Sequence, residues 1–139
     1  MAILSDYPIA PTLPATDIDR AKAFYRDVLG FTPVAEITAT GEVIFSTGPG
    51  NLFIVYRSSW AGSNQATAAA WRVGDLRATV QALRAKGVRF EEYDLPGVPM
   101  DDAIAHMPDG TLVAWFKDTE GNILGIDQFP ESYAFAHPA

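Results

Sequence analysis

One turn-and-strand pattern occurs twice in the sequence, and this repeat limits the folds open to the chain more than any other feature. Residues 118–127 read Asp-Thr-Glu-Gly-Asn-Ile-Leu-Gly-Ile-Asp, a tight Gly-Asn turn followed by a mostly apolar strand. Residues 50–56 repeat the pattern as Gly-Asn-Leu-Phe-Ile-Val-Tyr. Glycine and asparagine are the residues that turns use where the backbone needs a positive φ. The pair predicts one supersecondary unit written twice.

Each half also contains one predicted helix that begins at an aspartate and ends at a glycine. Asp17 is the predicted N-cap of a helix that reaches residue 29, and Gly30 follows it. Asp75 and Gly87 bound the second predicted helix in the same way, and apolar residues recur at helical spacing in both. The predicted strands cover residues 8–15, 34–39, 42–47 and 51–57 in the first half, and 68–73, 88–92, 111–117 and 122–128 in the second.

These elements predict an α+β fold made of two β-α-β-β-β modules within a single domain, residues 1–139. The first module covers residues 8–57 and the second covers residues 68–129. The small polar residues 58–67 between them are predicted to be a linker, and residues 130–139 a tail. Hairpin turns are expected at Thr40-Gly41 and Asp109-Gly110, and the acidic segment 93–102 is expected to be an irregular loop.

Composition excludes several classes of function. Ten Lys and Arg against 17 Asp and Glu give a formal net charge of −7, so no basic surface for nucleic acid is expected. The absence of cysteine excludes a disulfide framework and a thiolate metal site. The apolar opening, residues 1–4, is too short for a signal peptide or a membrane span. A soluble cytoplasmic protein with no membrane partner is therefore expected.

Three segments resemble one known family in the same order along the chain. Residues 14–31, 73–88 and 116–127 resemble the vicinal oxygen chelate superfamily, which includes glyoxalase I, extradiol dioxygenases and bleomycin-resistance proteins. The resemblance runs from about Ile9 to Gln128. It implies a curved mixed sheet of paired modules around a ligand cavity, with the helices outside. It also implies a homodimer, for which Trp60 in the linker and the tail residues Tyr133 and Phe135 are candidate contacts.

Enzymes of that family hold a divalent metal with His and Glu, and the positions implied by the resemblance lack such donors here. Those positions are Ala10, Ile54, Ala68 and Gly125. Imidazole nitrogen and carboxylate oxygen are what such metals require, and these side chains offer neither. We therefore expect no metal and no other cofactor.

Only two histidines could rebuild a metal site elsewhere. His106 precedes the Asp109-Gly110 turn and His137 lies in the tail, so both are expected at the surface or rim. A site that combines His106 with Asp101 or Asp102 stays open as an alternative. Otherwise Asp101-Asp102 and Glu91-Glu92 are expected to be solvated loop charges.

Strand alternation predicts which side chains face the ligand, because successive side chains point to opposite faces. The uniformly apolar set, such as Phe53 and Val55, is expected under the helices. The mixed set is expected to face the cavity. The predicted ligand-binding residues are Thr12, Ile54, Tyr56, Arg72, Trp115, Gly125 and Asp127. Two alternatives stay open: in one, Trp115 belongs to the core, and in the other, Arg72, Lys117 and Asp127 simply pair at the sheet rim.

The favoured function is a metal-free, bleomycin-resistance-like protein that binds a small organic ligand. One alternative is an enzyme of the same superfamily, of the lyase, isomerase or dioxygenase type. It would use a metal or, without one, Tyr56, Arg72 or Asp127 as acid–base groups. A further alternative is a dimeric interaction module with a vestigial pocket. No residue is assigned a catalytic role, and the sequence does not name the ligand.

Overall fold

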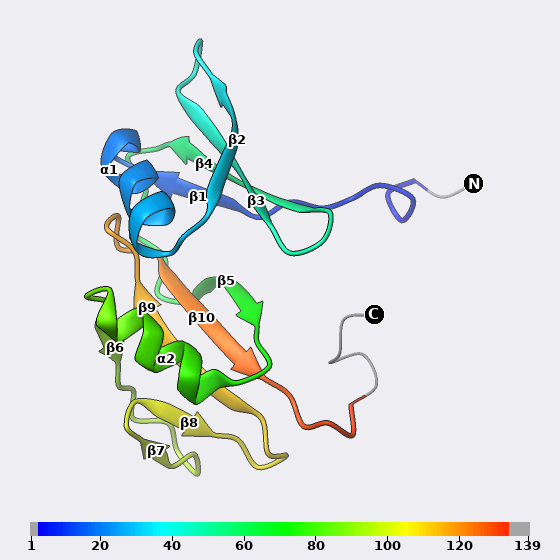
Figure 1. Cartoon of the computed structure of the whole chain (residues 1–139), viewed down its shortest axis with the longest axis vertical. Coiled ribbons are helices and arrows are strands. Elements are labelled where there is room, and N and C mark those ends of the chain that lie inside the picture. Colours follow the sequence, from blue (N-terminus) through cyan, green and yellow to red (C-terminus); the bar gives the residue numbers. More distant parts are fainter. Residues whose placement is uncertain (1–2, 134–139) are drawn as a thin grey trace. The chain divides into compact units, whose positions relative to one another are not determined.

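The computed structural model describes residues 3–133, and the chain divides into two compact units at Ala61/Gly62. The first unit contains β1 (Thr12–Ala15), α1 (Ile18–Ala23), the π-helical turn η1 (Phe24–Val28), β2 (Thr32–Ile37), β3 (Glu42–Thr47) and β4 (Asn51–Arg57). Its four strands lie in the order β1-β4-β3-β2, with β1 parallel to β4 and the other neighbours antiparallel. Figure 1 shows these elements in the blue to green part of the chain.

The second unit repeats this topology with extra short strands. It contains β5 (Thr67–Arg72), α2 (Leu76–Ala85), β6 (Phe90–Glu91), β7 (Met100–Asp101), β8 (Ile104–His106), β9 (Leu112–Lys117) and β10 (Ile123–Gln128). The strand order is β5-β10-β9-β8-β7, and β6 also pairs with β9. As in the first unit, the first strand is parallel to the last one. The predicted α+β fold with two related modules is confirmed within residues 3–133, as two sheets.

The helix boundaries follow from capping. The carboxylates of Asp17 and Asp75 accept hydrogen bonds from the backbone N–H of Arg20 and Ala78, both at 3.0 Å. Each satisfies one of the N–H groups that a helix leaves free at its start. Gly30 and Gly87 follow the helices with φ of +83° and +92°, the left-handed conformation that ends a helix at low steric cost.

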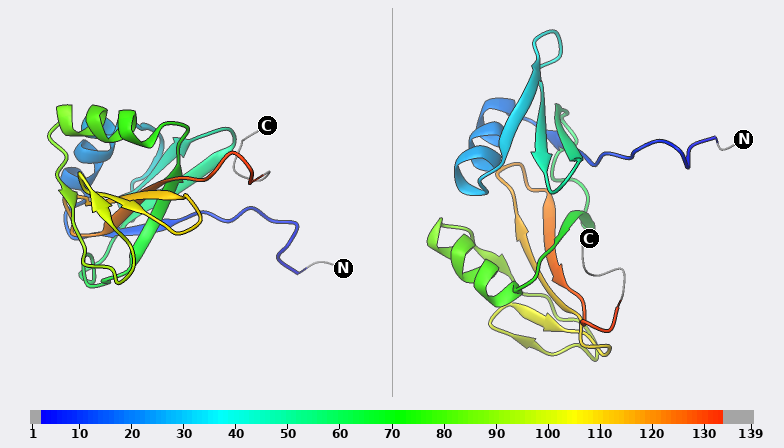
Figure 2. Two further views of the ribbon diagram at one scale, coloured as in Figure 1. Left: turned by 90° about the horizontal axis from the view of Figure 1, so that it is seen from below. Right: turned by 45° about the vertical axis from the view of Figure 1, so that its right-hand side comes forward.

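The two cores lie between helix and sheet, as strand alternation predicts. In the first unit Tyr25, Phe45 and Phe53 are fully buried, with ring centroids 5.1 to 5.8 Å apart. In the second unit α2 packs on β9 and β10, and Leu124 and Phe116 are buried. Figure 2 shows α2 lying along one side of these strands.

The repeated turn after β9 is a buried polar structure. Asp118 Oδ1 accepts hydrogen bonds from the backbone N–H groups of Glu120 and Asn122, both at 2.9 Å. Its Oδ2 accepts from the Asn122 side-chain amide at 2.8 Å. Gly121 has a φ of +84°, and a Cβ there would lie 3.1 Å from the Cα of Gly62. The turn therefore requires glycine for its backbone conformation and for its close contact with the start of the second unit.

Several predicted boundaries were wrong. The strand predicted over 8–15 begins only at Thr12, and the strand predicted over 34–39 lies at Thr32–Ile37. The segment 93–102 is not wholly irregular, because β7 pairs with β8 and Leu95 bridges Val98. The strand predicted over 88–92 contracts to Phe90–Glu91, so Glu91, which was also expected among the loop charges, lies in β6. In each case pairing with a neighbouring strand decided the outcome.

Candidate functional site

One face of the second sheet is not covered by α2, and we call it the helix-free face. Pairing places Ala70, Gly125, Trp115 and Glu91 in one row across β5, β10, β9 and β6. The neighbouring row contains Arg72, Asp127 and Val113. Because directly paired residues share a face, four of the predicted ligand-binding residues lie together there: Arg72, Trp115, Gly125 and Asp127.

Trp115 reaches across β10 at the position of Gly125. Its indole Nε1 donates a hydrogen bond to Thr67 Oγ1 at 3.1 Å, and Thr67 belongs to β5, on the far side of β10. A Cβ built on Gly125 would lie 3.5 Å from Trp115 Cδ1 and 3.6 Å from the Cβ of Ala70. These are ordinary van der Waals distances. The space that Gly125 leaves free is therefore bordered by the indole ring, and Trp115 is half-buried on this face.

A break in strand register brings Thr67 into this arrangement. Ile123 pairs with Thr67 and Leu124 pairs with Ala69, so Ala68 is the extra residue of a β-bulge. Simple alternation from Ala70 would place Thr67 on the helix side. A bulge shifts the residues before it to the other face, and Thr67 therefore joins Gly125. This residue was missed by sequence reasoning, because nothing in the run Thr-Ala-Ala-Ala indicates a bulge.

Arg72 and Asp127 form an ion pair across β5 and β10. Arg72 Nε lies 2.8 Å and Nη2 3.4 Å from the two carboxylate oxygens of Asp127. The guanidinium carbon also lies 3.7 Å from the centroid of the Phe129 ring, a cation–π contact. The alternative that these two charges pair with each other is confirmed. Lys117 has no part in the pair.

Tyr93 is the second residue of this face that sequence reasoning missed. Its ring meets the Trp115 ring edge to face, with centroids 5.4 Å apart and an interplanar angle of 72°. Its hydroxyl is buried and has no hydrogen-bond partner within residues 3–133. Burial, with a smaller contribution from the charge of Glu91, raises the pKa of this hydroxyl, so it stays protonated at neutral pH.

Replacing Tyr93 by Phe is therefore expected to leave the free energy of unfolding unchanged or to raise it by up to about 1 kcal/mol. The substitution keeps the ring contact with Trp115 and removes a buried hydroxyl that makes no hydrogen bond. Urea unfolding followed by circular dichroism measures the change. Tyr133→Phe is the matched control, because the Tyr133 hydroxyl donates to Asp109 Oδ2 at 2.7 Å, and its loss should lower stability. A clear loss of stability in Tyr93→Phe would show that its hydroxyl has a partner.

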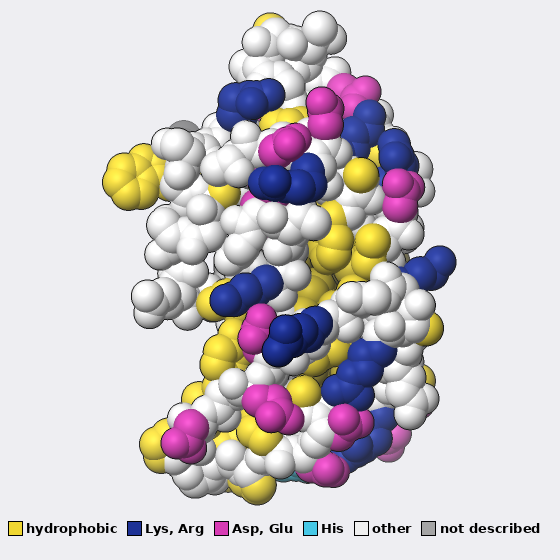
Figure 3. Space-filling view, turned by 90° about the vertical axis from the view of Figure 1, so that its left-hand side faces the viewer, with side chains coloured by type: hydrophobic (Ala, Val, Ile, Leu, Met, Phe, Trp, Pro, Cys, Tyr) yellow, Lys and Arg dark blue, Asp and Glu magenta, His cyan; other side chains and the backbone are white. Residues whose placement is uncertain are grey.

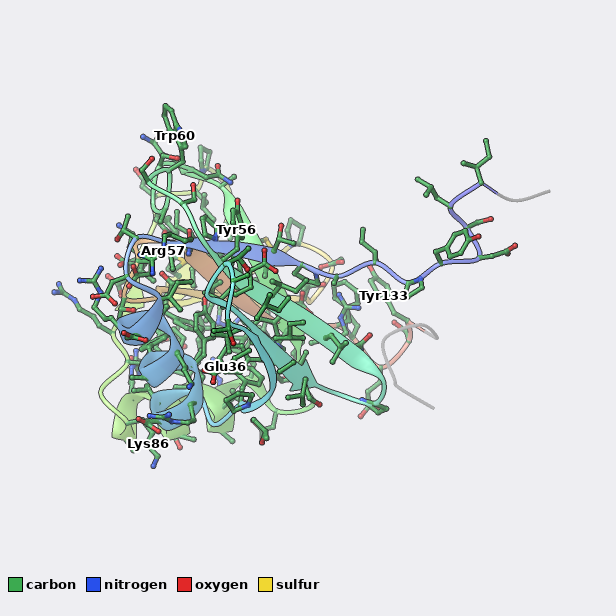
Figure 4. All side chains as sticks on the ribbon, turned by 90° about the horizontal axis from the view of Figure 1, so that it is seen from above. Glu36, Tyr56, Arg57, Trp60, Lys86 and Tyr133 are labelled. Atoms are coloured by element: carbon green, nitrogen blue, oxygen red, sulfur yellow. The ribbon has the colours of Figure 1, made fainter. Side chains whose placement is uncertain are left out.

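The remaining predicted ligand-binding residues lie in the first unit. Thr12 pairs with Ile54, and Pro14 pairs with Tyr56, between the parallel strands β1 and β4. Ile54 and Tyr56 are half-buried, whereas Phe53 and Val55, which alternate with them along β4, are buried under α1. Thr12, Ile54 and Tyr56 therefore share the face of the first sheet turned away from α1, and their role in binding stays a prediction. Figure 4 labels Tyr56.

The four positions at which the family resemblance implies metal ligands do not fit a metal ion. In the second unit Ala68 is the bulge residue and Gly125 borders the indole of Trp115, so this face offers a ring edge where a ligating carboxylate would be needed. In the first unit the corresponding residues, Ala10 and Ile54, carry no donor atom. Among residues 3–133, no group of three or more His, Asp and Glu side chains is close enough together to hold a metal ion.

At the alternative metal site, the side chains of His106, Asp101 and Asp102 contact arginines instead. Arg77 Nη2 lies 3.3 Å from Asp101 Oδ2 and 3.5 Å from His106 Nε2. Arg84 Nη1 donates to Asp102 Oδ2 at 3.0 Å. Figure 3 shows basic and acidic side chains next to one another on the side of the molecule that carries α2. A metal ion beside His106 would therefore face a guanidinium group, which opposes cation binding.

Two of the three candidate dimer contacts, Trp60 and Tyr133, lie within the described residues. Trp60 has 76% of its surface exposed, and Figure 4 shows its ring pointing away from the ribbon. Tyr133 is half-buried, and its hydrogen bond lowers the pKa of the Asp109 carboxyl. Phe135, like His137, lies outside the described residues. Among residues 3–133, neither helix has the length and apolar character needed to span a bilayer.

Comparison with known proteins gives consistent matches over most of the chain. Residues 9–126 match the model of the Glyoxalase/Bleomycin resistance protein/Dioxygenase superfamily. A glyoxylase-like domain-containing protein of Didymella fabae is 30% identical over 121 residues, which cover 82% of this chain and 87% of that protein.

Two solved structures show the shared fold. Lactoylglutathione lyase from Agrobacterium tumefaciens has a TM-score of 0.69 at 18% identity, over 96% of this chain and all (100%) of that one. A bleomycin-binding protein complexed with bleomycin has a TM-score of 0.65 at 21% identity, over 89% and 99% of the two chains.

Proposed function

Since the chain belongs to the Glyoxalase/Bleomycin resistance protein/Dioxygenase superfamily, we propose that it binds a small organic ligand on the helix-free face, without a metal ion. The family contains both enzymes and binding proteins, so membership alone does not choose between them. The side chains of the helix-free face support binding. They supply aromatic surface and small residues, but no set of metal ligands.

The observation that carries the proposal is the position of Trp115 beside Gly125. The indole is fixed at both ends, by the hydrogen bond to Thr67 and by the edge contact with Tyr93. A fixed ring loses little conformational freedom when a ligand stacks on it, and this favours affinity. Ala70 is exposed beside the ring, so an apolar ligand can approach without displacing a large side chain.

The alternative of a metal-free enzyme receives less support from the same residues. Among the acid–base candidates predicted from the sequence, Asp127 is the carboxylate, and both of its oxygens accept hydrogen bonds from Arg72. To take up a proton from a substrate it would have to give up part of that ion pair. The bleomycin-binding protein, whose structure contains bleomycin, shares the fold. For this chain we propose ligand binding without a chemical reaction. The homodimer and the cytoplasmic location stay predictions.

Purified protein is expected to contain no stoichiometric transition metal and to be stabilised by organic ligands. Elemental analysis measures the first property, and a thermal-shift screen of aromatic and amphipathic compounds, run with and without chelator, measures the second. A binding protein at a ligand concentration 100 times Kd gains about 2.7 kcal/mol, which is readily seen as a rise in Tm.

A stoichiometric metal would contradict the metal-free site, above all if chelator also removed a ligand's stabilising effect. If metal is absent and no compound of a broad screen raises the Tm, the interaction-module alternative becomes the better account.

A further inference from the structure

Glu91 places a carboxylate on the same face as the ring of Trp115. It lies in β6 directly opposite Trp115 and is half-buried. No hydrogen bond or ion pair of its carboxylate occurs within residues 3–133. Other acidic side chains of the second unit are paired with arginines, namely Asp101, Asp102 and Asp127. A partly buried carboxylate that lacks such a partner gains free energy when a cation binds next to it.

Tyr93 completes the surroundings of this carboxylate. Alternation along the chain places Tyr93 on the same face as Glu91, and the ring of Tyr93 meets that of Trp115. Burial, and to a smaller extent the charge of Glu91, raises the pKa of the Tyr93 hydroxyl. Aromatic faces attract cations through the negative charge of their π-systems. One carboxylate and two rings therefore favour a positive charge in the same place.

The net charge of the second unit also favours a cationic ligand. Residues 62–133 contain six Lys and Arg and eleven Asp and Glu, a formal net charge of −5. Of the basic residues on this face, Arg72 is held by Asp127, whereas Lys117 and Arg89 are exposed and form no ion pair with Glu91. A negative unit raises the local concentration of cationic ligands and disfavours anionic ones.

We propose that Glu91, Tyr93 and Trp115 bind the cationic group of an organic ligand, a protonated amine or a quaternary ammonium, on the helix-free face. The proposal rests on the proposed function, because it names the chemistry of the ligand that this face accepts. The carboxylate supplies the opposite charge, and the two rings supply an apolar wall that tolerates the methyl or methylene groups around the nitrogen.

Three probes of similar size and different charge test the proposal: benzyltrimethylammonium, benzyl alcohol and benzenesulfonate. Each is titrated into the protein labelled with ¹⁵N, and the indole N–H signal of Trp115, assigned with Trp115→Phe, is followed. The cation is expected to shift this signal most and to bind less tightly as salt is added. Glu91→Gln is expected to weaken binding of the cation about tenfold and to leave benzyl alcohol unchanged.

Glu92→Gln is the matched control, since it removes the same charge from the next residue, which is exposed and of opposite strand parity. Equal affinity of Glu91→Gln and the unchanged protein for benzyltrimethylammonium would overturn the proposal, as would an equal loss in Glu92→Gln. If benzyl alcohol or benzenesulfonate binds at Trp115 and the cation does not, the cation site is refuted, while binding of a small organic ligand on this face stands. If none of the three probes shifts the signal, the cation site is refuted as well, and the thermal-shift screen alone decides the proposed function.

Discussion

Gly125→Leu is expected to abolish binding of a ligand to the helix-free face while the protein stays folded. A Cβ at residue 125 would already lie 3.5 Å from Trp115 Cδ1, so the branched end of a leucine side chain must displace the indole or cover it. Either outcome removes the aromatic surface. Gly125 lies in a strand without a positive φ, so the leucine backbone is not strained, and overpacking costs about 1–3 kcal/mol. A ligand identified by thermal shift, titrated by calorimetry, provides the measurement.

Gly125→Ala separates the effect of bulk from that of losing glycine. Its Cβ fits at ordinary contact distances from Thr67, Trp115 and Ala70, so binding should persist within a few-fold. Alanine should also raise the free energy of unfolding slightly, by up to about 1 kcal/mol, because glycine has more conformational freedom to lose on folding. If Gly125→Leu binds the ligand as the unchanged protein does and is equally stable, the ligand site lies elsewhere.

Asp118→Ala is expected to lower the free energy of unfolding by about 3–4 kcal/mol, the largest loss of stability predicted for a polar side chain here. The hydrogen bonds to a buried carboxylate are lost, among them two from backbone N–H groups and one from the Asn122 side chain. These donors are left without an acceptor in a buried turn, which costs more than the lost bonds alone. Since domains of this size have about 5–15 kcal/mol in total, a drop in Tm of about 10 °C should be visible by calorimetry.

Asp118→Asn is the matched variant for this turn. An asparagine oxygen can still accept from the backbone N–H groups of Glu120 and Asn122, but its amide nitrogen would face the Asn122 side-chain amide, donor against donor. About half of the loss is therefore expected. Asp118→Ala with the stability of the unchanged protein would show that water replaces the carboxylate, and that the turn does not depend on this side chain.

Local sequence signals were sufficient for the elements that carry their own caps and turns. The strand predicted over 51–57 matches β4 residue for residue, because a Gly-Asn turn and an uninterrupted run of strand-forming residues mark it. Asp17 and Asp75 cap their helices as predicted, since an N-cap satisfies a neighbouring N–H group and needs no distant contact.

The short strand β7 was missed because no local signal marks it and only pairing with β8 creates it. β7 and β8 are joined by Asp102 and Ala103, at φ of 53° and 63°. Alanine rarely adopts this conformation, so the sequence gives no turn signal of the Asn-Gly kind. Pairing with β8 and β9 offsets the local cost. The strand predicted over 88–92 contracts to the two residues of β6, whose pairing with β9 places Glu91 opposite Trp115.

The sequence by itself determined the repeated modules and the faces of the strands, apart from the start of β5, because these depend on residue type and alternation alone. The tertiary structure decided which side chains meet on the helix-free face. The bulge at Ala68 turns Thr67 toward Trp115, and the indole crosses β10 at Gly125. Such contacts depend on the register between strands distant in sequence, and a shift of one residue moves a side chain to the other face.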